Sequence, residues 1–237
     1  MKAGHCLGNP LPQRNTTMKR FANIAASFAL AALSESAWAQ AALAPPAALP
    51  LAQAQAPAFA VGDEWEFAYT NVLEPRRNNN FTQRIVSVAG GQAVLAVGDG
   101  RAGPTVLDAS GNITSGGGGA YEPSDGRLQF PLAVGKSWSA SYIYKSGNWI
   151  SHCDREAKVV GVERIDTPVG PLDAFKIEQK TSWSGNDQYG GHGVTHETDW
   201  YAPAVGRIAR LDYQDIPVKG PATTTHVELT RWRPAAP

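Results

Sequence analysis

The stretch Tyr201-Ala-Pro-Ala-Val-Gly-Arg-Ile208 decides the fold prediction, because the chain contains its pattern twice. Tyr121-Glu-Pro-Ser-Asp-Gly-Arg-Leu128 has tyrosine, proline, glycine and arginine at the same places, without a gap. A second pair matches as well: Ala60-Val-Gly-Asp-Glu-Trp-Glu-Phe-Ala-Tyr69 is repeated in outline by Ala133-Val-Gly-Lys-Ser-Trp-Ser-Ala-Ser-Tyr142. Two matching pairs in the same order indicate a duplicated unit. We therefore predict repeat units over about residues 60–130 and 133–213, followed by a C-terminal strand near residues 224–232.

Within both units, aromatic and polar side chains alternate with a period of two residues. Trp65, Phe67 and Tyr69 share one face of the first unit, and Trp138 and Tyr142 share one face of the second. This alternation is typical of antiparallel strands with one buried and one solvated face. Clusters of glycine, serine and asparagine between these stretches indicate hairpin turns. No part of the chain beyond residue 60 shows a convincing helical stripe.

The number of expected strands sets the predicted architecture. Each unit has room for about four or five short strands, and two units side by side give a sheet so large that its twist should curl it. We therefore predict an all-β fold with a single domain over residues 60–234. Its single curved antiparallel sheet would form an open or half barrel, with the C-terminal strand covering the open edge.

The N-terminal part has the layout of an export signal. Met18-Lys-Arg20 is a short basic segment, residues 21–33 are largely apolar, and Ala37-Trp-Ala39 is a cleavage site of small residues. This is typical of a signal peptide over residues 1–39, and Met18 is an alternative start. The apolar run is too short to span a bilayer, so we expect no stable membrane anchor and a periplasmic or secreted protein. Residues 40–59, rich in alanine and proline, are predicted to be a linker.

The charge of the chain excludes one class of partner. The sequence has 21 basic and 21 acidic residues, and removal of the leader would take away more basic residues than acidic ones. The mature chain would be mildly negative, with both signs interspersed and no basic patch. This argues against nucleic acid as a partner.

Two groups of residues contain side chains of the kinds found in catalytic and metal-binding sites. His192 and His196 would be about 13 Å apart on a strand, too far for one metal ion. In His152-Cys153-Asp154, a strand would point the cysteine away from the histidine and the aspartate, so no nucleophile–base pair forms locally. We therefore predict no catalytic residue, no metal and no cofactor, and expect that the protein is not an enzyme.

The second unit resembles a known family. The residues that carry the resemblance are Val159-Val-Gly-Val-Glu163, Thr167-Pro-Val-Gly170, Leu172-Asp-Ala-Phe-Lys-Ile177 and Trp200-Tyr-Ala-Pro-Ala-Val-Gly-Arg-Ile208. They are similar to an exported, β-rich proteobacterial family of unknown function (TapB-like). That family resembles the lipoprotein-carrier half-barrels of the LolA/LolB type. The resemblance covers about residues 132–213 and implies a curved sheet that holds acyl chains.

Aromatic side chains are the predicted site. On a sheet face such residues usually form a core, but no helical layer is available here to cover them. A ligand could therefore fill the concave face, against residues Trp65, Phe67, Tyr69, Trp138, Tyr142, Phe175 and Trp183. The first functional hypothesis is an exported, non-enzymatic binding or carrier module for an apolar, acyl-type small molecule or lipid. The alternative is a structural or assembly protein of the cell envelope that acts through contacts with another envelope protein.

The two arginines of the repeated motif can be interpreted in two ways. Arg127 and Arg207 could bind a carboxylate or a phosphate group. We favour the other interpretation, in which each arginine stabilises its own turn by binding to carbonyl groups or to a neighbouring acid.

The leader generates the first prediction. Protein recovered from the exported fraction should have the mass of a chain that begins at Gln40. Intact-mass spectrometry measures this directly. A mass that still includes residues 21–33 would show a retained anchor instead.

Overall fold

The structure is a computed structural model that describes residues 51–98, 100, 103–186 and 191–236. The predicted signal peptide lies outside these residues, as does most of the linker. Within the described part no helix is long and apolar enough to cross a membrane. The regular elements are β1 (Glu64–Asn71), η1 (Pro75–Arg77), β2 (Asn79–Ala89), β3 (Gln92–Val97), β4 (Thr105–Leu107), β5 (Ile113–Gly116), β6 (Gly119–Glu122), β7 (Ser137–Ser146), β8 (Trp149–Thr167), β9 (Gly170–Gly185), β10 (His192–Ala202), η2 (Pro203–Val205), β11 (Arg207–Pro217) and β12 (Thr223–Arg233).

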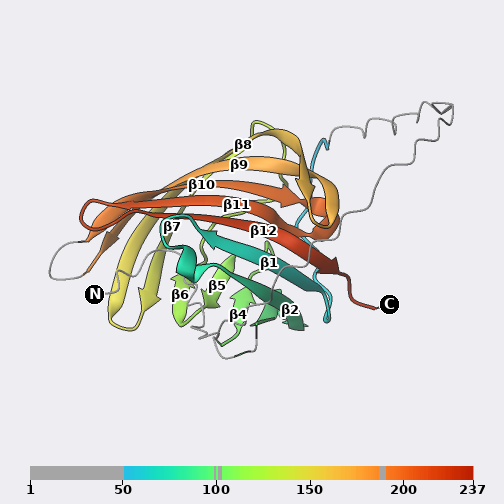
Figure 1. Cartoon of the computed structure of the whole chain (residues 1–237), viewed down its shortest axis with the longest axis horizontal. Helices are drawn as coiled ribbons and strands as arrows, with labels where there is room; N and C mark the ends of the chain where they lie inside the picture. Colours follow the sequence, from blue (N-terminus) through green and yellow to red (C-terminus); the bar gives the residue numbers. More distant parts are fainter. Residues whose placement is uncertain (1–50, 99, 101–102, 187–190, 237) are drawn as a thin grey trace, which may run out of the picture. The chain divides into compact units, whose positions relative to one another are not determined.

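The strands form one closed antiparallel barrel (Figure 1). Each strand pairs with its neighbours in sequence, and β1 also pairs with β12, where Trp65 lies opposite Trp232. The prediction of an all-β fold is confirmed. The prediction of an open or half barrel is wrong, because the C-terminal strand joins β1 and does not merely cover an edge. Closure removes the edge strands that would otherwise expose unpaired backbone groups.

The first unit has more strands than the four or five that the alternation predicted. The described residues contain six strands between residues 60 and 130, whereas the second unit has five, β7–β11, followed by the C-terminal strand β12. Three of the first six, β4, β5 and β6, have only three or four residues each. A period of two cannot be recognised over so few residues, which explains the difference.

Alternation within the longer strands places one face inside the barrel. On β9, Ile177 and Trp183 are buried, whereas the intervening Glu178 and Lys180 are exposed. The buried side chains form three apolar clusters. The first cluster is the largest and includes Leu229 of β12, which is fully buried.

The last residues of the predicted linker pack on the barrel. Ala54 exchanges two backbone hydrogen bonds with Leu132, at 2.8 and 2.9 Å. The ring of Phe59 meets the ring of Trp65 edge-on, with 6.3 Å between their centroids. The described part of the fold therefore begins before residue 60.

The two strands that begin the predicted repeat units start with the same turn. Gly62 and Gly135 both have a positive φ, of 105° and 88°, which a side chain would resist. The amide of Gly62 donates to the carbonyl of Ile85 on β2, and the amide of Gly135 donates to the carbonyl of Val159 on β8, both at 2.9 Å. Each turn therefore leads into its strand with the same backbone hydrogen bond.

The tryptophan that follows each turn binds one of the repeated motifs. The indole N–H of Trp65 donates to the carbonyl of Val205 at 2.9 Å, and that of Trp138 donates to the carbonyl of Gly126 at 3.1 Å. Each motif thus accepts a hydrogen bond from the first strand of a predicted unit. In this way β1 is tied to a segment about 140 residues away in sequence.

The motif tyrosines do not occupy equivalent strands. Tyr121 lies on β6 and Tyr201 on β10, so the order of strands differs between the two segments, although both side chains are buried. Gly126 and Gly206 have nearly the same φ, 61° and 64°. The local chemistry of the motif is therefore alike at both places, while the repeat units 60–130 and 133–213 stay a prediction.

Closure through β12 generates a prediction about stability. Leu229→Ala should destabilise the protein by about 2–5 kcal/mol, because it leaves a cavity in the largest cluster. Arg231→Ala, two residues along the same strand, removes only an exposed ion pair with Glu66 and should cost less than about 1 kcal/mol. Urea unfolding measures both. Similar small losses in the two variants would mean that β12 does not close the barrel.

Candidate binding site in the barrel interior

The residues predicted to line a ligand site do not share one surface. Trp65 and Phe67 belong to the first cluster and Trp138 and Phe175 to the second. Tyr142 and Trp183 belong to the third cluster, and Tyr69 is partly exposed and belongs to none. Phe175 is fully buried among other side chains. The structure therefore brings the predicted residues together only in pairs.

The third cluster contains three of the seven tyrosines of the chain. Its buried members are Tyr121, Tyr142, Tyr144, Cys153 and Trp183, with Trp149 packed against them. The ring centroid of Tyr121 lies 6.0 Å from that of Tyr142 and 5.0 Å from that of Tyr144. Large apolar rings with polar tips are thus concentrated on β6, β7, β8 and β9.

Next to this aromatic cluster, two adjacent rows of polar side chains cross the inner face of the sheet. They follow from the cross-strand register: residues directly opposite each other form the rows Arg155, Thr181, Thr195, Asp215 and Gln179, Glu197, Tyr213, Thr225. All eight are buried, and their sequence neighbours on the strands are more exposed. We call these eight residues the polar band.

Two arginines hold Glu197 in the polar band. Its Oε1 lies 3.0 Å from Nη2 of Arg155, and its Oε2 lies 2.9 Å from Nη2 of Arg127. Arg155 belongs to β8, whereas Arg127 comes from the long connection between β6 and β7. Nε of Arg127 also lies 3.7 Å from Asp199 and 4.0 Å from Asp125. We call these five charged side chains the ion cluster; all are buried except Arg127, whose side chain is 12% exposed.

Gln179, a member of the polar band, forms hydrogen bonds with two members of the ion cluster. Its Oε1 accepts a hydrogen bond of 2.8 Å from Nη1 of Arg155, and its Nε2 donates one of 2.6 Å to Oδ2 of Asp199. Asp125 accepts a hydrogen bond from the backbone N–H of Ile113 at 3.0 Å. The cluster therefore connects β5, β8, β9 and β10 with the β6–β7 connection.

Burial and neighbouring charges divide the acids into two kinds. Burial alone would raise the pKa of Glu197, but the charges of Arg127 and Arg155 outweigh it and lower this pKa. Burial raises the pKa of Asp199 to about 7, helped by the charge of Glu197 and opposed by that of Arg127. Burial also raises the pKa of Asp125. Glu197 is therefore ionised at neutral pH, whereas Asp199 is close to half protonated.

Several polar atoms in this region have no hydrogen-bond partner among the described residues. They include the hydroxyls of Thr181 and Tyr213 and Nε of Arg155, and also the hydroxyl of Tyr142, which lies beside the Arg155 guanidinium but cannot donate to it. Burial raises the pKa of both tyrosines, so their hydroxyls stay protonated and can donate. Because buried polar groups in proteins are nearly always hydrogen-bonded, these atoms indicate a place for water or for a ligand.

Sequence reasoning missed the ion cluster, although one signal for it was present. Arg155, Thr181 and Glu197 fall in the inward phase of their strands, where apolar residues are expected. Arg127 lies near the neighbouring acid Asp125, as the favoured interpretation expects, and it also forms an ion pair with a carboxylate of β10, which neither interpretation included. Arg207 instead donates to Oε1 of Gln83 at 2.6 Å.

The histidines and the aspartate of the two groups considered for catalysis or metal binding are exposed, whereas Cys153 is buried in the third cluster. His192 and His196 are exposed on β10, and His152 and Asp154 are exposed on β8. In the part of the chain that the structure describes, no three histidine, cysteine or acidic side chains are grouped so that they could hold a metal ion.

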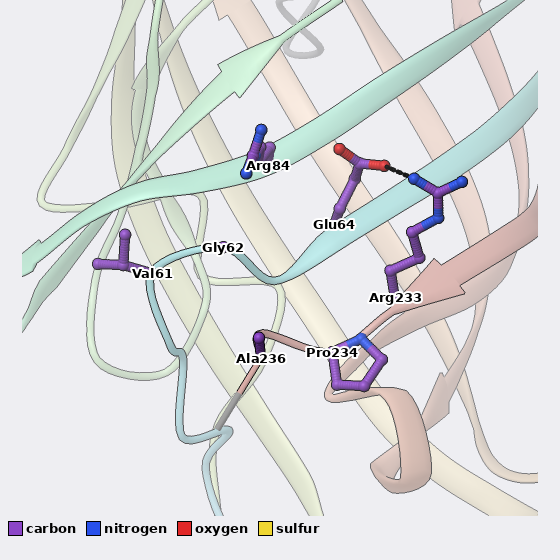
Figure 2. Close-up of a pocket in the computed structure, with 7 residues that line it drawn as sticks. All are labelled: Val61, Gly62, Glu64, Arg84, Arg233, Pro234 and Ala236. Atoms are coloured by element: carbon purple, nitrogen blue, oxygen red, sulfur yellow. Dashed lines mark ion pairs between the residues drawn. The ribbon is translucent and has the colours of Figure 1, made fainter.

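A separate pocket lies on the surface where β1 begins and β12 ends (Figure 2). It has a volume of about 420 Å³ and is lined by Val61, Gly62, Glu64, Arg84, Arg233, Pro234 and Ala236. Glu64 and Arg233 form an ion pair across it, with 3.6 Å between Oε1 and Nη1. None of the predicted site residues lines this pocket.

Comparison with known proteins shows partial similarity to solved structures. No protein-family model matches the sequence, and no curated protein is significantly similar to it. One similar structure is a candidate lipoprotein from Parabacteroides distasonis, with 12% identity, a TM-score of 0.41, and coverage of 73% of this chain and 96% of the other. Another is the hypothetical lipoprotein YmcC from Escherichia coli, with 9% identity, a TM-score of 0.44, and coverage of 73% and 89%.

A third similar structure is a candidate exported protein with a YmcC-like fold from Bacteroides fragilis. It has 12% identity, a TM-score of 0.38, and coverage of 76% of this chain and 99% of the other. The resemblance to the TapB-like family and to carriers of the LolA/LolB type stays a prediction.

The raised pKa of Asp199 predicts a dependence of stability on pH. An unfolded aspartate has a pKa of about 3.8, so the stability that neutral Asp199 contributes is complete below that pH and is lost as pH rises through about 7. Asp199→Asn should therefore change the melting temperature little at or below pH 4, where this loss has barely begun. The advantage of the variant over the wild type should grow as pH rises from about 4 to 7, and at pH 8 its melting temperature should be higher by roughly 5 °C or more.

Exposed Glu178 on β9 supplies the control for this prediction. Glu178→Gln should leave the pH dependence of melting unchanged. Thermal melts between pH 4 and pH 9 measure both variants. If Asp199→Asn loses stability with rising pH as steeply as the wild type, Asp199 is not the buried, half-protonated acid described above.

Proposed function

We propose that this chain is an exported, non-enzymatic binding protein, and that the interior of the barrel beside the polar band receives a small ligand with an apolar part. The export rests on the signal-like leader of the sequence. The observation that carries the binding role is the set of buried hydroxyls without partners, on Tyr142, Thr181 and Tyr213, beside the aromatic cluster. This location replaces the open concave face, which the closed barrel does not have.

The aromatic cluster supplies the apolar side of such a site. Tyr142 and Trp183 flank Cys153, because Cys153 on β8 pairs with Tyr142 on one side and with Trp183 on the other. Their rings offer flat apolar surface to an acyl chain or a similar group. Burial of apolar surface, at about 25 cal/mol per Å², would drive the binding.

The chemistry of the polar band favours binding over catalysis. None of its eight residues is a histidine. Glu197 is held by two arginines, which stabilise its ionised form and make it a poor proton carrier. A carboxylate in this environment positions neighbouring groups and does not exchange protons readily.

The assembly hypothesis stays a prediction of the sequence. Recognition by strand addition needs an edge strand, and the closed barrel formed by the described residues has none. A protein partner would therefore have to bind the outer face of the barrel or a connection between strands.

Titration with a fluorescent fatty acid tests the proposed function. The folded wild type should show saturable binding, and Tyr142→Leu should weaken it about tenfold, because the ring and hydroxyl leave the inner face. The matched control is Lys145→Gln, which changes only an exposed ion pair with Glu122. Circular dichroism confirms that each variant is folded. A folded wild type without saturable binding would contradict the binding role.

A further inference from the structure

The geometry points to an anion site within the polar band, one that binds the carboxylate or phosphate group of an amphipathic ligand. This inference rests on the proposed function, because the apolar part of the same ligand would lie against the aromatic cluster. It adds the chemical class of the ligand, which the aromatic residues alone do not specify.

The unpartnered donors surround Arg155. Thr181 lies directly opposite Arg155 across β8 and β9, and the guanidinium carbon of Arg155 lies 6.0 Å from the ring centroid of Tyr142. Tyr213 lies directly opposite Glu197, whose Oε1 is 3.0 Å from Arg155. Three hydroxyls from three strands therefore share one region of the interior with one guanidinium.

These groups are buried side chains, not surface residues. The exposed fractions are 3% for Tyr142, 4% for Tyr213, 1% for Thr181 and 2% for Arg155. The three hydroxyls and Nε of Arg155 each lack a hydrogen-bond partner among the described residues. Burial without a partner costs each group about 1–3 kcal/mol, so a partner of the right chemistry would be bound with a substantial gain.

Donors predominate over acceptors among the unpartnered atoms. Among the acids of this region, Oε2 of Glu197 and Oδ1 of Asp199 have no hydrogen bond, and the carboxylate of Asp215, also in the polar band, accepts the indole N–H of Trp183 at 2.9 Å. Oε2 of Glu197 already faces Nη2 of Arg127 at 2.9 Å, which satisfies its charge. The four donors, in contrast, have nothing to donate to. A ligand that supplies acceptor oxygens fits this arrangement.

The guanidinium of Arg155 favours an anion as the partner of these donors. The carboxylates of Asp125, Glu197 and Asp199 already offset Arg127 and Arg155, so the site depends on the donors beside Arg155 and not on an excess of positive charge. Carboxylate and phosphate oxygens accept hydrogen bonds from guanidinium and hydroxyl groups at the same time, and such charge-assisted bonds are the stronger kind.

Calorimetric titration of the exported, processed protein with ligands of one chain length tests the inference. The probes are octanoate, octyl phosphate, octanol and octylamine. We expect at least one of the two anions to bind about tenfold or more tightly than octanol and octylamine, because each good charge-assisted hydrogen bond contributes more than 1 kcal/mol. The tighter of the two anions shows whether the site takes a carboxylate or a phosphate.

The outcomes separate this inference from the proposed function. Equal affinities for octanol and for the anions would overturn the anion site and leave the binding role intact. Absence of binding by all four probes would contradict both.

Variants that remove single hydroxyls test the site itself. Tyr213→Phe and Thr181→Val should weaken binding of the favoured anion about tenfold and leave binding of octanol unchanged. Neither should lower the melting temperature, because the hydroxyl that is removed has no hydrogen bond to lose. The control Tyr201→Phe makes the same chemical change in the second cluster, outside the polar band, and should not affect the affinity. Unchanged anion binding in both site variants would place the anion elsewhere.

Discussion

Glu197 forms ion pairs with two arginines inside a closed barrel, and much of the structure depends on this contact. Arg155 reaches it from β8, and Arg127 reaches it from the connection between β6 and β7. Each charged group alone would cost several kcal/mol to bury, and only mutual pairing makes their burial tolerable. The contact therefore fixes an irregular segment against two regular strands, β8 and β10. Apolar residues of similar size would often be as stable, so the proposed role in ligand binding would give the chain a reason to keep the charges.

Closure of the sheet and the ion cluster depend on each other. Because β1 pairs with β12, inward side chains cannot reach solvent through an open edge, and polar ones must find partners inside. Trp65 and Trp138 contribute from the two strands that begin with the same turn, since each donates its indole N–H to the backbone of a repeated motif. One of these motifs also carries Arg127. The turn chemistry of the chain thus positions the segment that brings a guanidinium to Glu197.

The sequence allowed the strands to be predicted but not the way in which they close. Alternation around Trp138 and Trp183 correctly indicated buried and exposed faces, because a period of two is a local property. The pairing of Trp65 with Trp232 joins the two ends of the domain, and no local pattern reveals it. Arg155 and Glu197 occupy the inward phase, but phase alone does not tell which opposite charge lies across the sheet. That depends on register, which is set by turns and bulges over the whole barrel.

A double-mutant cycle between Arg127 and Glu197 tests the central claim most directly. The free energy of unfolding would be measured for the wild type, Arg127→Met, Glu197→Gln and the double variant. The structure places both side chains in the barrel interior, so we expect a coupling energy of at least about 2 kcal/mol. An exposed pair gives about 0.2–1 kcal/mol. A coupling within that lower range would show that the two charges do not meet in the barrel interior, and would contradict this account.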